Sequence, residues 1–167
     1  MKFRLASFLF CVIAVTHYSV LAQNSTELYL EGARLATEGE LAQAKEIFKQ
    51  VIVVSPYYAL GHYGIGRAYM YEGGDLSIAI RELKLAVSLD DRLAQAHFYL
   101  GLAYYLNNEY EHAISSLYYA YQLDDTYLEA LYNIGAIYDY MGHSSKALLY
   151  YKRYRDEKQR EEEYFDY

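Results

Sequence analysis

A chain of 167 residues with a formal net charge of −7 lacks the concentrated Lys and Arg that phosphate binding requires, which argues against a nucleic-acid partner. Its content of 54% apolar and 22% charged residues is typical of a globular protein rather than a disordered one. A single Pro, together with apolar spacing that lacks strand-like alternation, favours an all-helical fold.

Residues 1–22 have the features of a cleaved signal peptide. Lys2 and Arg4 precede an apolar stretch at residues 5–15. Residues 20–22, which end in Ala22, fit the small-residue pattern of a cleavage site before Gln23. The alternative is an uncleaved membrane anchor, but the apolar stretch is shorter than the roughly 20 residues that a membrane span needs. We therefore expect export, with membrane contact only through this segment if it stays attached. Cleavage would also remove Cys11, the one cysteine.

Two columns of small residues recur along the rest of the chain at intervals of 34 or 35 residues. They are Gly32, Gly66, Gly101 and Gly135, and Ala44, Ala79, Ala113 and Ala147. An internal Gly costs a helix about 1 kcal/mol relative to Ala, so its recurrence predicts a close approach of two helices at each copy. Each copy contains an apolar segment with a period of about 3.6 residues, a polar turn and a second such segment.

The polar turns are expected at residues 38–40, 72–75, 107–109 and 142–144, which carry residue types that favour turns and helix ends. Asn24, followed three residues later by Glu27, is a plausible start for the first helix. One interval in each column is 35 residues long instead of 34. The extra residue falls in the turn at 72–75, where an insertion costs little. Each copy is therefore expected to be a helix-turn-helix unit.

This pattern resembles the tetratricopeptide repeat, in which W-x₂-L-G-x₂-Y is followed by A-x₃-F and then P. The third copy matches it through His97, Leu100, Gly101, Tyr104, Ala113 and Leu117. No copy has the Trp, whose place is taken by His62 and His97 in two repeats, and only the first copy keeps the Pro, at Pro56.

The resemblance implies an all-α protein, a right-handed α-solenoid of about four repeats and eight helices. The repeats are placed at residues 25–58, 59–93, 94–127 and 128–161, within a domain of residues 23–161. An acidic aromatic tail follows at residues 162–167. An exported array of this kind looks most like bacterial periplasmic or cell-envelope proteins, so we expect a periplasmic, envelope or secreted location.

Repeat phase sorts the 23 tyrosines into different predicted roles. Tyr69, Tyr104 and Tyr138 lie three residues after the recurring Gly and are expected to pack in the core. In tetratricopeptide proteins, the places three residues before this Gly, and one, four and five residues after it, line the concave surface. The resemblance thus predicts a partner-binding groove formed by Tyr29, Tyr63, Arg67, Met70, Tyr71, Phe98, Leu102, Tyr105, Tyr132, Asp139 and Tyr140.

Some tetratricopeptide domains clamp the C-terminal carboxylate of chaperones with Lys and Asn at these groove places. Here Tyr and Phe stand in the Lys places, and Ala, Leu or Arg67 stands where Asn would be. We expect this clamp to be absent. Arg67 is expected to be solvated, or paired with Asp139 or a nearby Glu.

No combination of residues indicates catalysis, a cofactor or a metal site. His62 and His97 could approach each other, but a structural metal needs four ligands, so buried packing is expected for both. The serines lack a nucleophile elbow, and the turn at residues 72–75 is acidic and would repel phosphate. We expect neither an enzyme nor a cofactor-binding protein.

These observations indicate a non-catalytic adaptor that binds a protein or peptide in an aromatic groove. The alternative is that the same groove holds a hydrophobic small ligand such as a lipid, glycan or metabolite. Tyr150, Tyr151 and Tyr154 lie on the last helix, where a following repeat would cover them. We expect them to be exposed and to support homo-oligomer formation through the last repeat.

Overall fold

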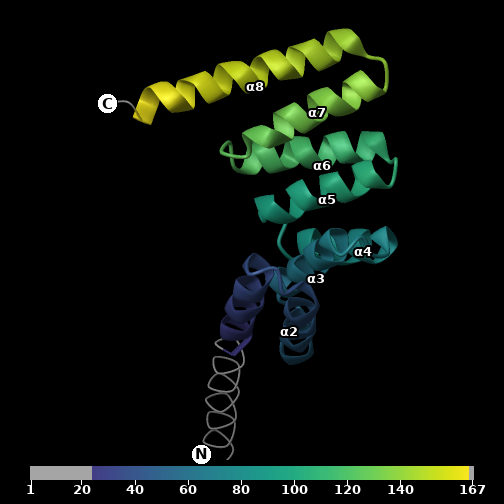
Figure 1. Ribbon diagram of the computed structural model, residues 1–167, viewed down its shortest axis with the longest axis vertical. Coiled ribbons are helices and arrows are strands. Elements are labelled where there is room, and N and C mark those ends of the chain that lie inside the picture. Colours follow the sequence, from purple (N-terminus) through teal and green to yellow (C-terminus); the bar gives the residue numbers. More distant parts are fainter. Residues whose placement is uncertain (1–23, 166–167) are drawn as a thin grey trace, which may run out of the picture.

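The computed structural model describes residues 24–165; the expected signal segment therefore lies outside the described residues. Residues 24–165 form helices joined by turns, without a strand (Figure 1). A first helix covers residues 24–37. It is followed by α2 (Leu41–Val54), α3 (Ala59–Tyr71), α4 (Leu76–Leu89), α5 (Ala94–Leu106), α6 (Tyr110–Leu123), α7 (Leu128–Tyr140) and α8 (Ser144–Phe165).

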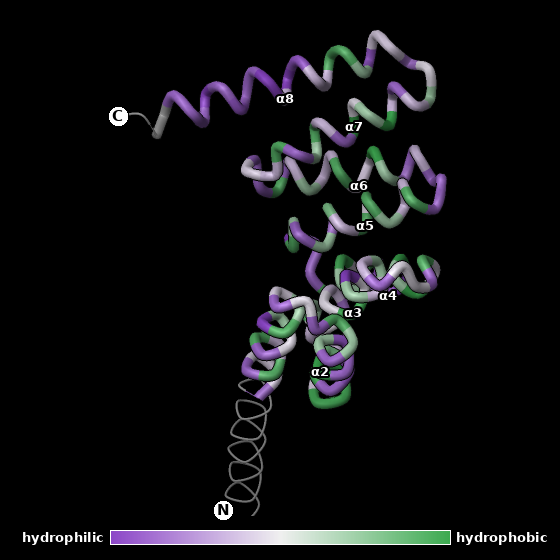
Figure 2. Tube along the Cα trace, in the orientation of Figure 1, coloured by the Kyte–Doolittle hydropathy of each residue, from purple (hydrophilic) through white to green (hydrophobic). Residues whose placement is uncertain are grey.

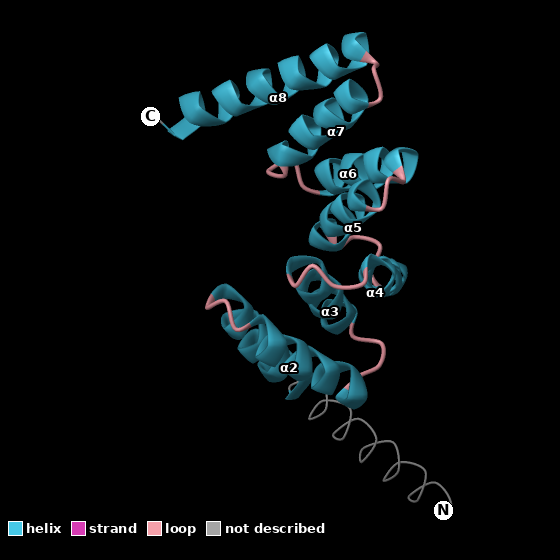
Figure 3. Ribbon diagram, turned by 45° about the vertical axis from the view of Figure 1, so that its right-hand side comes forward, coloured by secondary structure: helices cyan, strands magenta, loops and turns pink. Residues whose placement is uncertain are grey.

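The helices pair as antiparallel hairpins that stack into a solenoid, as Figures 1 and 3 show. The main contacts join helices adjacent in the chain, and α3 also touches α5 of the next hairpin. This arrangement confirms the expected all-α solenoid of four hairpins and eight helices in the described part of the chain. α8 continues past residue 161, so much of the predicted tail is helical. No helix within residues 24–165 is long and apolar enough to cross a membrane.

The recurring glycines lie where the two helices of a hairpin meet. A Cβ atom on Gly66 would lie 2.6 Å from Cγ of Leu83, and a Cβ on Gly101 would lie 2.6 Å from Cγ of Leu117. Equivalent contacts join Gly32 to Phe48 and Gly135 to Tyr151. The predicted close approach of helices is thus confirmed, and each Gly faces one large side chain of its partner helix.

Each hairpin turn contains one residue with a left-handed backbone. These residues are Gly39 (φ 87°), Gly73 (φ 65°), Asn108 (φ 62°) and Gly142 (φ 76°). Gly adopts this conformation without a Cβ clash, and Asn tolerates it better than most residues. The turn residues predicted from the sequence therefore end the first helix of each hairpin.

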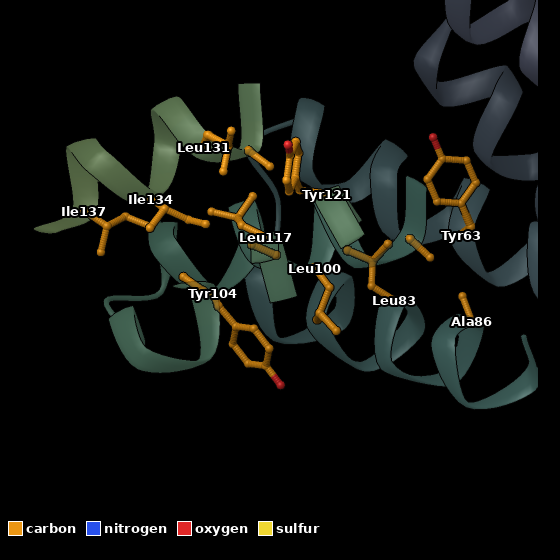
Figure 4. Close-up of a cluster of buried hydrophobic side chains, with 14 of the residues drawn as sticks. Tyr63, Leu83, Ala86, Leu100, Tyr104, Leu117, Tyr121, Leu131, Ile134 and Ile137 are labelled. Atoms are coloured by element: carbon orange, nitrogen blue, oxygen red, sulfur yellow. The ribbon is translucent and has the colours of Figure 1, made fainter. Parts of the chain in front are cut away.

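Aliphatic and aromatic side chains from several helices cluster in the core together with small residues (Figure 4). Leu83, Leu117, Leu131 and Ile134 are fully buried, and the recurring Ala column is buried as well. Tyr104 is buried in this core, as predicted. Tyr69 and Tyr138 are half-buried and pack against the core from its edge.

His62, in the place of the repeat's Trp, is 5% exposed and makes two hydrogen bonds. Its Nε2 donates to the carbonyl oxygen of Pro56 over 2.9 Å, because a carbonyl can only accept. Its Nδ1 lies 2.8 Å from Oε2 of Glu82, whose other oxygen, Oε1, accepts from Arg81.

His97 occupies the equivalent place in the next repeat but has different partners. Its ring stacks on Tyr119 at 5.7 Å, and its Nε2 donates to the carbonyl oxygen of Asp91. The two histidines therefore have separate structural partners. Among residues 24–165, no group of three or more His, Cys, Asp or Glu side chains is arranged to hold a metal ion.

The Gly101 contact predicts that Gly101→Ala destabilises the fold, whereas helix propensity alone predicts the opposite. Propensity favours Gly101→Ala by about 1 kcal/mol, but the new Cβ would meet the Leu117 side chain and also its backbone N at 3.0 Å. We expect a net loss of about 1–3 kcal/mol in the free energy of unfolding, measured in urea. When Leu117→Ala is added, the double variant should lose less free energy of unfolding than the sum of the losses in the two single variants. Stabilisation by Gly101→Ala alone would contradict the close contact.

The Glu82 contact predicts a pH-dependent stability. Burial tends to raise the pKa of Glu82, but hydrogen bonds from His62 and Arg81 outweigh it and hold the pKa below its ordinary value. A carboxyl group with a lowered pKa stabilises the fold above its unfolded pKa, and this contribution disappears as the pH falls through the folded pKa. Glu82→Gln should therefore cost about 1–2 kcal/mol near pH 7 and progressively less toward pH 3.

Urea unfolding of both proteins across this pH range measures the difference. Glu46→Gln is the matched control, because Glu46 forms an exposed pair with Lys49 and should cost less than about 0.5 kcal/mol. A Glu82→Gln penalty that stays constant with pH would contradict the assignment.

Candidate functional site

Arg67, on α3, lies among tyrosines that come from two successive hairpins. Its guanidinium carbon lies 5.6 Å from the ring centre of Tyr71 and 5.4 Å from that of Tyr99 on α5. Both distances are in the range of cation–π contacts, which strengthen when water is excluded. Tyr63, one helical turn before Arg67, lies beside the same Tyr99 ring at 5.7 Å.

Tyr99 joins these side chains into one group. Its ring lies 5.6 Å from Phe98 and 6.2 Å from Tyr71, and its hydroxyl is 3.2 Å from the Tyr71 hydroxyl. Phe98 in turn lies 5.2 Å from the ring of Tyr127, which directly precedes α7. We call this group the Arg67 cluster; it comprises Arg67, Tyr63, Tyr71, Phe98, Tyr99 and Tyr127.

Arg67 is only partly solvated and does not pair with Asp139 or a nearby Glu, contrary to the sequence-based expectation. It is half-buried, and its Nε is inaccessible to water and has no hydrogen-bond partner within residues 24–165. No carboxylate of the described chain forms an ion pair with it, and Asp139 is exposed on α7. The rings of Tyr71 and Tyr99, rather than a carboxylate, lie against the guanidinium.

The tyrosines leave the charge of Arg67 uncompensated. Burial raises the pKa of Tyr63, an effect that the nearby guanidinium only partly offsets. Burial and the hydrogen bond with Tyr71 raise the pKa of Tyr99 to about 12. Both phenols are therefore neutral at physiological pH, and Arg67 remains a partly desolvated cation.

A cavity of about 180 Å³ opens beside Arg67, between the first helix, α2 and α3. Its walls include Ala36, Leu41, Phe48 and Tyr71, so the lining is mainly apolar apart from Arg67. Such a cavity suits a ligand that carries an acidic group beside an apolar one. The acidic group would contact the cation, and the apolar group would enter the cavity.

A second aromatic group lies on α5, α6 and α7. The ring of Tyr110 is 6.2 Å from Tyr105 and 5.3 Å from Tyr140. Tyr105 and Tyr140 are exposed, and Tyr110 is half-buried. This group and the Arg67 cluster together bring most of the predicted groove aromatics into two patches.

The other predicted groove residues have mainly packing roles. Tyr29 lies against Phe48 and Tyr58, and Tyr132 is exposed at one edge but packs on Tyr151 and Tyr154 of α8. Met70 and Leu102 are half-buried against the core. Tyr63 is 6% exposed, so it supports the surface from below and does not line it, because the Tyr99 ring lies against it.

The terminal tyrosines are also placed differently from the prediction. Tyr150, Tyr151 and Tyr154 are half-buried, because Tyr138 and Tyr132 of α7 pack against them. The exposed large apolar side chains of α8 are instead Leu148 and Leu149.

Sequence reasoning missed Tyr99 and Tyr127. Tyr99 directly follows Phe98, and this place faces the preceding repeat, where Tyr63 and Tyr71 lie. Tyr127 lies in a loop, outside the helical columns. One indication in the sequence that Tyr99 belongs to the site is its position beside the predicted groove residue Phe98. The direction in which the Tyr99 side chain points, however, depends on how two repeats pack.

Comparison with known proteins identifies the fold. A family model described as tetratricopeptide repeat matches residues 129–157. The crystal structure of MamA is 32% identical to this chain, with a TM-score of 0.70, and the match covers 77% of this chain and 74% of that one. The chain belongs to the tetratricopeptide repeat family.

Two other tetratricopeptide structures share the fold at lower identity. PilF of Pseudomonas aeruginosa is 22% identical, with a TM-score of 0.74 over 83% of this chain and 63% of that one. The first tetratricopeptide domain of Spaghetti (RPAP3), solved with the HSP90 peptide SRMEEVD, is 19% identical, with a TM-score of 0.68 over 72% of this chain and 94% of that one. A search of curated proteins finds no match.

The environment of Arg67 predicts that the side chain contributes little to stability. Its buried Nε has lost water without gaining a hydrogen bond, which offsets the favourable ring contacts. We expect Arg67→Met to leave the free energy of unfolding unchanged or to raise it by up to about 1 kcal/mol. Urea unfolding tests this expectation. A loss of more than about 2 kcal/mol would mean that Arg67 has a structural role.

Proposed function

We propose that this tetratricopeptide protein is a non-catalytic adaptor that binds an acidic segment of a protein partner at the Arg67 cluster. The observation that carries the proposal is the half-buried guanidinium, whose Nε has no hydrogen-bond partner in the described chain. A carboxylate that enters the cavity lined by Arg67 would supply the missing counter-charge to the accessible part of the guanidinium. The exposed ring of Tyr71 would contact the rest of the segment.

The cavity beside Arg67 supports a peptide rather than a hydrophobic small ligand. Its volume of about 180 Å³ lies below the roughly 300–1,000 Å³ of typical small-ligand pockets. It suits one apolar side chain of a peptide whose acidic neighbour reaches Arg67. The RPAP3 domain, which shares the fold, is bound to a peptide whose sequence includes two Glu and an Asp. This precedent supports a protein partner for the present chain.

For residues 1–22 we retain the proposal of a signal peptide. Its support is the order of basic, apolar and small residues. It would place the adaptor in the periplasm or cell envelope, or outside the cell.

Selection from a random heptapeptide library on the full chain and on Arg67→Gln tests the proposal. We expect peptides selected by the natural protein to be enriched in Asp or Glu, and this enrichment to disappear with Arg67→Gln. Calorimetry on one selected peptide should show at least tenfold weaker binding to Arg67→Gln, a loss of about 1.4 kcal/mol. Tyr71→Ala should also weaken binding, since this ring is 57% exposed beside Arg67.

Tyr57→Ala is the matched control, because Tyr57 is 85% exposed in the loop between α2 and α3. Circular dichroism checks that all variants keep their helices. Selection of neutral peptides that bind Arg67→Gln as tightly as the natural protein would reject the acidic segment. Equal loss of binding on Tyr57→Ala and Tyr71→Ala would reject this site.

A further inference from the structure

α8 has an exposed face where the inner helices are covered. Ile80 on α4 and Ile114 on α6 occupy equivalent places, 34 residues apart, and both are half-buried against the core. The next equivalent residue is Leu148, which is 69% exposed, and its neighbour Leu149 is exposed as well. Within the described residues no helix follows α8, so its stacking face has no neighbour.

The charges of α8 are separated by sign along the helix. Residues 144–155 contain four basic residues and no acidic one, whereas residues 156–165 contain five acidic residues and two basic ones. Figure 2 shows the hydrophobic start of α8 and the hydrophilic stretch that follows it. A helix dipole favours acids at the N-terminus and bases at the C-terminus, so this order is opposite to the one that stabilises a single helix.

The exposed face has a self-complementary order. Leu148, Lys152, Arg155, Gln159 and Glu162 are all exposed and lie three or four residues apart, which places them in one stripe along α8. Lys152 and Glu162 form no ion pair within residues 24–165, whereas Arg155 bonds to Asp156. The stripe therefore begins apolar, continues basic and ends acidic.

We propose that two copies of this chain associate through their α8 helices in an antiparallel arrangement. The basic half of each helix then lies beside the acidic half of the other. The opposite charges of the second copy thereby compensate a charge order that is unfavourable within one helix. A register that sets Lys152 against the second copy's Glu162 repeats the same pair at the other end by two-fold symmetry. In this register Leu148 and Leu149 of each copy lie near the end of the second copy's α8.

This association is independent of the proposed function, because Arg67 lies on α3. Exposed ion pairs contribute little each and are screened by salt. We therefore expect a weak dimer that forms at about 100 μM protein in low salt and dissociates at least partly as salt rises. Self-association of this kind is isologous and stops at two copies.

Charge-swapped variants of the full chain test the arrangement by sedimentation velocity. Lys152→Glu with Arg155→Glu makes the basic half neutral, and Glu161→Lys with Glu162→Lys makes the acidic half basic. We expect each variant alone to dimerise at least tenfold more weakly than the natural chain. An equimolar mixture of the two should recover a heterodimer, because the two altered helices have opposite net charge.

Asp91→Lys with Asp125→Lys is the matched control for Glu161→Lys with Glu162→Lys, since both replace two acidic residues with Lys and the control residues lie in exposed loops. It should change dimerisation less than twofold. The proposal is overturned by a natural chain that stays monomeric at 200 μM in low salt, by a mixture no better than either variant, or by an equal effect of the control. Stronger association of Lys152→Glu with Arg155→Glu alone would indicate a parallel pair and would also overturn it.

Discussion

The contact on which the structure depends is that between a glycine on the first helix of each hairpin and one large side chain on the second. At Gly66 and Leu83, and again at Gly101 and Leu117, no space remains for even a methyl group. This contact fixes how closely the two helices approach and their axial register. Because it recurs in all four hairpins, the stacking surfaces recur too, and a solenoid results.

The same contact determines what the groove residues can do. Arg67 directly follows Gly66, so when Gly66 faces Leu83 the next side chain is turned toward the following repeat. There it meets Tyr99, which comes from α5. The cluster is therefore held by two hairpins, and its geometry depends on packing between repeats rather than on one helix. A cation held this way keeps its orientation without a carboxylate of its own, which is the basis for proposing that it recognises one from outside.

The sequence predicted the hairpins, turns and close helix contacts because each depends on residues within one repeat. Gly101 and Asn108, for example, show their roles through local steric rules. The candidate site was harder to predict, because the burial of Tyr63 and the environment of Arg67 depend on which ring of the next repeat lies against them. Tyr151 illustrates the same limit at the end of the array. It was expected to be exposed, but it fills the place that Phe48 or Leu117 fills elsewhere and packs against Gly135 of its own hairpin.

Contacts confined mainly to neighbouring hairpins also bear on how the molecule opens. In such an array the outer units can detach without disrupting the inner ones, so amide hydrogens at the ends exchange sooner than those in the middle. The Arg67 cluster spans the second and third hairpins, away from both ends. A segment bound there would bridge two units that otherwise open separately, and it would extend the range over which the array behaves as one cooperative body.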